Sequence, residues 1–255
     1  MGNSARPQGT FWYHLSILLA LVIVVPSAAA DDKATDNPLI AAASKLVDIR
    51  AKGAKPFQLE IDFTAQINVQ RAGHLTLKWA SSDLWSEYVT LGDYKQLIVR
   101  KGETEFIARN EHFTPMRVNQ LDGLLRLFSA ESKEDNNYWQ IKKTRAEGNS
   151  TCFEIKQRHS HADGKRSICV DTSTNELLKD ETKSDVLLSE QFSDYQAIGD
   201  HRYPRDLRRY ENGSLLLKAS VVSLEEKSFT DADFQPAKGS MERQRCAKCS
   251  SSYPD

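Results

Sequence analysis

The alternation that decides the fold begins after Pro56, where the sequence reads Phe57-Gln-Leu-Glu-Ile-Asp-Phe63. Apolar side chains stand at every second position, which is the repeat of a strand that buries one face. The same repeat returns along most of the chain, with short breaks such as Gly73, Gly92-Asp93 and Asn212-Gly213 as turns. We therefore predict strands near residues 57–69, 73–80, 84–91, 95–101, 104–109, 138–144, 150–158, 166–172, 176–183, 186–195, 205–211 and 214–226.

Two segments carry helical spacing instead. Residues 39–50 place their apolar side chains on one helical face, with Asn37 as the N-cap and Gly53 as the stop. Residues 119–128 repeat the spacing with Leu121, Leu124, Leu125 and Phe128. The order of elements predicts a mainly β (α+β) fold. We expect a curved antiparallel sheet, or half-open β-barrel, with one N-terminal helix and a short helix crossing its concave face.

The first thirty residues have the organisation of a secretory signal peptide. Arg6 is their single charged residue, an apolar run covers residues 15–25, and small residues fill 26–30 after Pro26. A retained anchor is the alternative, because residues 11–30 are about long enough to cross a bilayer. The short apolar run and the alanines at its end favour cleavage near Ala30. We therefore predict an exported, periplasmic protein with no membrane span after cleavage.

The rest of the chain is predicted to be one domain with a short tail. No proline- or glycine-rich linker appears before Asp231, so residues 31–238 are predicted to form the domain. Residues 239–255 are polar and should be poorly ordered. Of the 34 Lys and Arg only Arg6 precedes residue 31, which leaves 33 basic against 35 acidic residues. Nucleic-acid binding needs a concentrated positive surface, so this balance argues against nucleic acid as a partner.

The four cysteines indicate disulfides, as expected in an exported chain. Cys152 and Cys169 lie in two β-like runs, and a hairpin centred near His161 places them opposite each other across the strands. Cys246 and Cys249 form a C-x-x-C pair inside the polar tail, where no second ligand pair or helix start supports a redox or metal site. We predict a cross-strand disulfide for the first pair and a local one for the second.

No catalytic signature is present, so we predict a protein that is not an enzyme and holds no metal or cofactor. His159 and His161 would share a hairpin tip, but two ligands are too few for a zinc site. Asn149 and Asn212 match the glycosylation acceptor pattern, which matters only in a host that glycosylates exported proteins.

The strands are rich in aromatic and aliphatic residues, most of which taken singly would belong to a core. A curved sheet covered by only two helices leaves part of its concave side open to a hydrophobic ligand. From strand alternation and the face of residues 119–128, we predict the lining of this cavity to be Phe57, Leu59, Ile61, Phe63, Leu75, Leu77, Trp79, Trp85, Leu121, Leu124 and Leu125.

Several segments carry a resemblance to a known family. The strand, glycine turn and aromatic strand of residues 85–108, and the later segments 192–204 and 229–236, resemble outer-membrane lipoprotein-sorting domains of the LolA/LolB type. Residues 79–85 and 115–121 are similar to an exported acidobacterial domain often found before a TonB-type C-terminal domain. The resemblance implies a half-barrel that accommodates a lipid or lipopeptide, with no catalytic residues to carry over.

These observations predict a binding or carrier protein of the cell envelope. Its partner would be a hydrophobic ligand or a lipidated protein, or else another envelope protein. Three rival functions remain: an interaction or sensor module that binds no lipid, a thiol or metal protein acting through Cys246 and Cys249, and a purely structural envelope protein.

The leader generates a direct prediction. We expect the exported protein to begin at Asp31, because small residues at positions 28 and 30 suit signal peptidase. N-terminal sequencing of the exported protein measures this. An intact Met1 in a membrane fraction would show a retained anchor instead.

Overall fold

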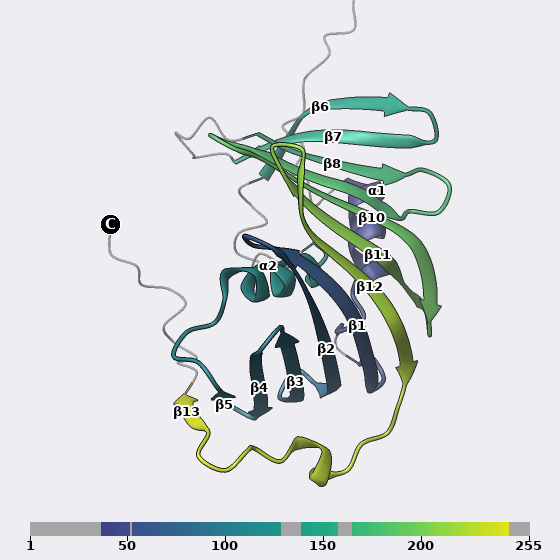
Figure 1. Ribbon diagram of the computed structural model, residues 1–255. Helices are drawn as coiled ribbons and strands as arrows, with labels where there is room; N and C mark the ends of the chain where they lie inside the picture. The colour runs from purple at the N-terminus through teal and green to yellow at the C-terminus, as the bar shows by residue number, and fades with distance from the viewer. Residues whose placement is uncertain (1–36, 52, 129–138, 158–164, 245–255) are drawn as a thin grey trace, which may run out of the picture. The chain divides into compact units, whose positions relative to one another are not determined.

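The computed structural model describes residues 37–51, 53–128, 139–157 and 165–244 (Figure 1). The chain divides into two units, Met1–Ala30 and Asp31–Asp255, and all described residues belong to the second. The predicted signal peptide lies outside the described residues. Among the residues described, no helix is both long enough and apolar enough to span a bilayer.

One antiparallel sheet carries the fold, and the chain begins it at the centre. Strands β1 to β5 follow one another outward, each paired with the strand before it. Their bounds are β1 (Phe57–Gln66), β2 (Gln70–Ser81), β3 (Leu84–Leu91), β4 (Tyr94–Lys101) and β5 (Thr104–Arg109).

The second half of the sheet is built from its far edge back to the centre. The bounds of these strands are β6 (Trp139–Glu147), β7 (Ser150–Gln157), β8 (Lys165–Asp171), β9 (Leu177–Lys183), β10 (Leu187–Ile198), β11 (His201–Glu211) and β12 (Ser214–Glu226). Strand β12 then pairs with β1, with Phe57 opposite Glu226 and Ala65 opposite Leu217. The predicted strands are thereby confirmed, most of them to within a few residues.

The sheet is curved and does not close, because β6 lies at one end of the strand order and β13 (Met241–Gln244) at the other. Helices α1 (Pro38–Val47) and α2 (Met116–Leu125) both contribute to the one hydrophobic cluster that the inward-facing strand residues form. Asn37 caps α1 as predicted, since its Oδ1 accepts from the backbone N–H of Leu39 at 3.1 Å. The predicted curved sheet with two helices is therefore confirmed, but Gly53 is not the stop of α1, which ends at Val47, and α2 ends at Leu125, three residues before Phe128.

The tail contains a strand that the sequence did not predict. After a 3₁₀ turn at Asp231–Phe234, residues Met241–Gln244 form β13 and pair antiparallel with β5. All four side chains of β13 are exposed, so the strand shows no alternation of buried apolar and exposed polar residues that would have predicted it. Residues 245–255, with Cys246 and Cys249, lie outside the described residues.

Gly73 is a second difference from the prediction, since it lies within β2 and not at a turn. It faces Phe63 across the β1–β2 pair, and a Cβ there would lie 2.3 Å from Phe63 Cζ. The absent side chain makes room for the aromatic ring.

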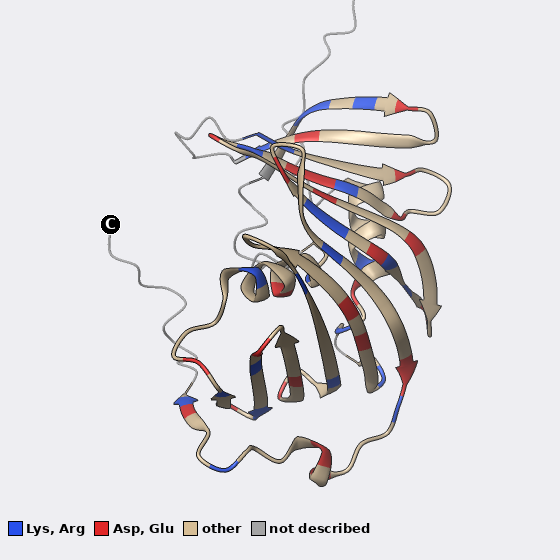
Figure 2. Ribbon diagram, in the orientation of Figure 1, with Lys and Arg blue, Asp and Glu red and all other residues tan. Residues whose placement is uncertain are grey.

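Charged side chains are mixed along β10, β11 and β12, as Figure 2 shows. Neighbours of opposite sign pair closely, with Arg209 Nη1 2.6 Å from Glu190 Oε1 and Arg208 Nη2 2.7 Å from Asp206 Oδ2. Charge on this part of the sheet is therefore balanced locally.

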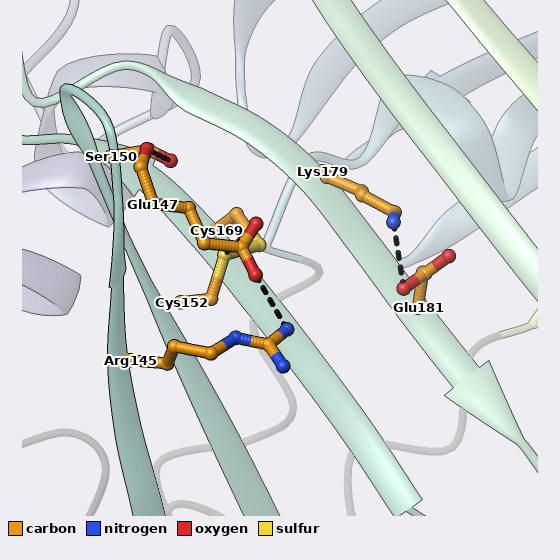
Figure 3. The surroundings of a disulfide bond; sticks show 7 residues. All are labelled: Arg145, Glu147, Ser150, Cys152, Cys169, Lys179 and Glu181. Atoms are coloured by element: carbon orange, nitrogen blue, oxygen red, sulfur yellow. Dashed lines mark hydrogen bonds and ion pairs between the residues drawn. A yellow bond between two sulfur atoms is a disulfide. The ribbon is translucent and has the colours of Figure 1, made fainter.

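The predicted disulfide between Cys152 and Cys169 is confirmed (Figure 3). The two residues are direct partners in the β7–β8 register, with Cα atoms 4.0 Å apart. Their neighbours Phe153 and Ile168 join the hydrophobic cluster, and side chains alternate along a strand. The bond therefore lies on the outward face of the sheet, away from the core.

Removal of this disulfide should lower stability without changing the fold. The bond closes a loop with a sequence separation of 17, for which the chain-entropy model gives about 3 kcal/mol. Equilibrium urea unfolding of the Cys152→Ala/Cys169→Ala double variant against the oxidised parent measures the loss. An unchanged unfolding midpoint would show that the two cysteines are not joined in the exported protein.

Candidate functional site

The residues predicted to line a cavity gather in one hydrophobic cluster. The β1–β2 register places Phe57 opposite Trp79, Leu59 opposite Leu77 and Ile61 opposite Leu75, so their side chains share one face. All the predicted residues except Trp85 are buried, and Trp85 is partly buried against the cluster; these are Phe57, Leu59, Ile61, Phe63, Leu75, Leu77, Trp79, Trp85, Leu121, Leu124 and Leu125. Most of them pack as core, and their contact with a ligand stays a prediction.

A cavity of about 420 Å³ opens beside this cluster, and three of the predicted residues border it. Leu77, Trp79 and Trp85 form an apolar wall, which Ile98 and Ile107 extend. Strands β3 to β5 add Glu87, Gln96, Arg100, Glu105 and Arg109, while Asn119, Asp122 and Arg126 come from α2 and its C-terminal end. The volume lies within the range of small-molecule sites.

Strand register explains why charged residues meet the apolar wall. Directly paired positions of antiparallel neighbours point to the same face. Trp79 pairs with Trp85, Trp85 with Arg100, Arg100 with Glu105 and Glu105 with Arg243, which gives one row across β2, β3, β4, β5 and β13. This row changes from aromatic to charged along its length.

The charged end of the row is an ion-pair network. Arg100 and Glu105 are only 7% and 6% exposed, and Arg100 Nη1 lies 3.7 Å from Glu105 Oε1. Arg243 on β13 donates from Nε to Glu105 Oε2 at 3.1 Å and also from Nη2. The strand missed by the sequence analysis thus contributes to the wall of the cavity.

Gln96 on β4 pairs with Arg109 on β5, and side-chain hydrogen bonds connect these two residues through Thr114. Arg109 Nη1 donates to Thr114 Oγ1 at 3.1 Å, and Thr114 Oγ1 donates to Gln96 Oε1 at 2.9 Å. Tyr94 donates to the same oxygen at 2.8 Å. Gln96 is buried, so these bonds hold the Arg109 guanidinium in place beside the cavity.

Glu87 on β3 brings a carboxyl group to the lining of the cavity. It faces the cavity from a position between the inward-facing Trp85 and Val89. Burial raises its pKa to about 7, the negative charge of Asp122 adds to the rise, and Arg50 and Arg126 oppose it. This side chain therefore exchanges a proton near neutral pH.

Sequence reasoning missed the polar half of this site. The signal was present, because Glu87 stands on the apolar phase of its strand between Trp85 and Val89. A charged residue on the buried phase of an alternating strand marks either a paired core charge or a site. Only the strand register shows that several such residues converge.

A cluster of possible metal ligands near the disulfide offers no site. Glu147, Cys152 and Cys169 lie together, but both sulfur atoms are joined to each other and cannot act as thiolates. Arg145 Nη2 also lies 2.5 Å from Glu147 Oε1, as Figure 3 shows.

Known structures share this architecture at low sequence identity. A LolA superfamily protein from Nitrosomonas europaea matches with a TM-score of 0.48 and 12% identity, over 77% of this chain and 96% of that one. An outer membrane lipoprotein-sorting protein domain from Vibrio parahaemolyticus gives 0.48 and 12%, over 76% and 94%. A DUF1329 family protein from Desulfovibrio piger gives 0.48 and 13%, over 78% and 97%.

The half-barrel is thus similar to those of the LolA superfamily protein, the lipoprotein-sorting domain and the DUF1329 protein. With TM-scores below 0.5 the likeness supports no argument about function. No protein-family profile matches the sequence, and no curated protein matches it. The resemblance to a domain that precedes a TonB-type domain stays a prediction.

The raised pKa of Glu87 predicts a pH-dependent contribution to stability. The Glu87 carboxyl loses its proton near pH 4.5 in the unfolded chain and near pH 7 in the folded protein. The protonated carboxyl therefore makes its full contribution to stability below pH 4.5, and this contribution is lost as the pH rises towards 7. Across that interval we expect wild type to lose about 3 kcal/mol of stability relative to Glu87→Gln.

Urea unfolding of both proteins from pH 4 to 8 measures this difference. Glu154→Gln on β7 controls for the loss of one carboxylate. Parallel pH profiles for wild type and Glu87→Gln would contradict the assignment.

Proposed function

We propose that this chain is an exported binding or carrier protein of the cell envelope that accommodates the apolar part of a ligand on the concave side of its sheet. The observation that carries the proposal is the apolar wall formed by Leu77, Trp79 and Trp85 beside a cavity of about 420 Å³. Apolar surface in a concave site favours a ligand that can displace water from it.

The state of Trp85 supports a binding role over a purely structural one. Trp79 is buried and stacks on Phe57 with ring centroids 5.3 Å apart, so it completes the core. Trp85 is only partly buried, although it lies on the same face and directly opposite Trp79. A large aromatic side chain with one free side in a cavity can contact a ligand at little conformational cost.

Two features support the proposal that the protein is exported. The leader of the sequence and the Cys152–Cys169 disulfide both fit an oxidising compartment outside the cytoplasm. We further propose that the protein is not an enzyme, and that the cavity serves binding alone.

Substitution of Trp85 tests the proposal. With a pyrene-labelled hexadecanoyl probe, Trp85→Ala should weaken binding about tenfold, because losing roughly 60 Å² of apolar contact costs about 1.5 kcal/mol. Fluorescence titration measures the dissociation constant, and circular dichroism checks the fold.

Tyr88→Ala is the matched control. Tyr88 lies on the same strand but on the opposite face, where it is 40% exposed. Its loss should leave probe binding unchanged. Equal probe affinities of wild type and a well-folded Trp85→Ala would show that the cavity is not the binding site. An empty protein with a stable protein partner, seen by native mass spectrometry after mild extraction, would favour the interaction module instead.

A further inference from the structure

The cavity carries an excess of positive charge. The basic residues that border it are Arg50, Arg100, Arg109, Arg126 and Arg243. The acidic residues that border it are Glu87, Glu105 and Asp122. This excess of basic over acidic residues differs from strands β10 to β12, where charges of opposite sign are mixed along the strands (Figure 2).

Two of the three acidic groups already form ion pairs with arginines of the cavity. Glu105 accepts from Arg243 and lies beside Arg100, and Asp122 Oδ2 lies 2.8 Å from Arg126 Nη2. Glu87, with a pKa of about 7, supplies only part of a negative charge at neutral pH. The acids of the cavity therefore do not neutralise all of its arginines.

Arg50 and Arg109 are the arginines left over. Among the described residues neither has a carboxylate oxygen within 4.0 Å, and both are partly buried. Arg109 uses one of the five N–H donors of its guanidinium in the hydrogen bond to Thr114. A guanidinium fixed in a partly desolvated site is a strong binding group for a carboxylate or phosphate.

We propose that the cavity recognises an anionic amphiphile, whose carboxylate or phosphate group binds at Arg109 and Arg50 while its apolar chain lies against Trp85 and Leu77. This inference rests on the proposed function for the chain and adds the chemistry of the head group. The apolar chain of the ligand corresponds to the apolar wall, and its head group corresponds to the two arginines of the same cavity that have no carboxylate partner.

The test compares ligands that differ only in charge. The probes are pyrene-labelled hexadecanoic acid, its methyl ester and inorganic phosphate, each titrated at pH 8 against the full exported protein. The acid should bind at least ten times more tightly than the ester. Phosphate should displace the acid at millimolar concentrations if the arginines accept an anion without a chain, and failure to displace it would show that the apolar chain is required.

Arg109→Gln should lower the affinity for the acid about tenfold, which brings it to the affinity for the ester. The affinity for the ester should not change. Arg109→Lys, which keeps the charge, should retain most of the preference. Arg208→Gln is the matched control, since Arg208 pairs with Asp206 on β11 next to the buried Leu207 and so faces outward. Arg50→Gln gives a second variant if Arg109→Gln lowers the thermal midpoint.

The outcomes separate the two proposals. If the acid and the ester bind wild type equally, the anionic subsite is wrong while the apolar cavity stands. If neither binds wild type but phosphate does, the arginines bind a small anion and the carrier function is wrong. An unchanged preference in both well-folded Arg109→Gln and Arg50→Gln would overturn the assignment to these residues.

Discussion

The pairing of β1 with β12 is the contact on which the rest of the sheet depends. These strands lie at opposite ends of the main domain sequence, and each also ends a run of consecutive antiparallel strands. Their pairing joins the two runs into one curved surface. Closing so long a stretch of chain costs entropy before any contact compensates it. Leu59, Ile61 and Leu217, all completely buried on the inner face of this pair, offset that cost through the hydrophobic effect.

Local patterns predicted most of this architecture. Alternation and the turn residues between strands place β3, β5 and β12 residue for residue. The positions of Cys152 and Cys169 about a central turn were enough to predict their register. Strand β13 could not be predicted this way, because its four side chains are all exposed and its contacts, such as that of Arg243 with Glu105, join residues far apart in the sequence.

The site was less predictable than the fold, for a physical reason. Alternation tells which side chains face inward, and it assigned Leu77, Trp79 and Trp85 correctly to that face. It cannot tell whether an inward position is filled by a neighbouring helix or borders open space. That depends on where α2 lies over the sheet, which is a matter of tertiary packing. The same limit hid Glu87 and Arg109, since single charges in strands are commonly solvated.

The buried Arg100–Glu105 pair adds weight to a recognition role for the cationic end of the cavity. Removing two charges from water costs several kcal/mol per ion, and apolar residues of similar volume often stabilise a fold as well or better. A pair only 7% and 6% exposed is therefore poorly explained by stability alone. Its position between Trp85 and Arg243 suits another purpose, which is to hold a fixed electrostatic surface next to an apolar one. In the proposed site a charged amphiphile would be preferred over a neutral one, because a neutral ligand would leave Arg109 and Arg50 desolvated and without a partner.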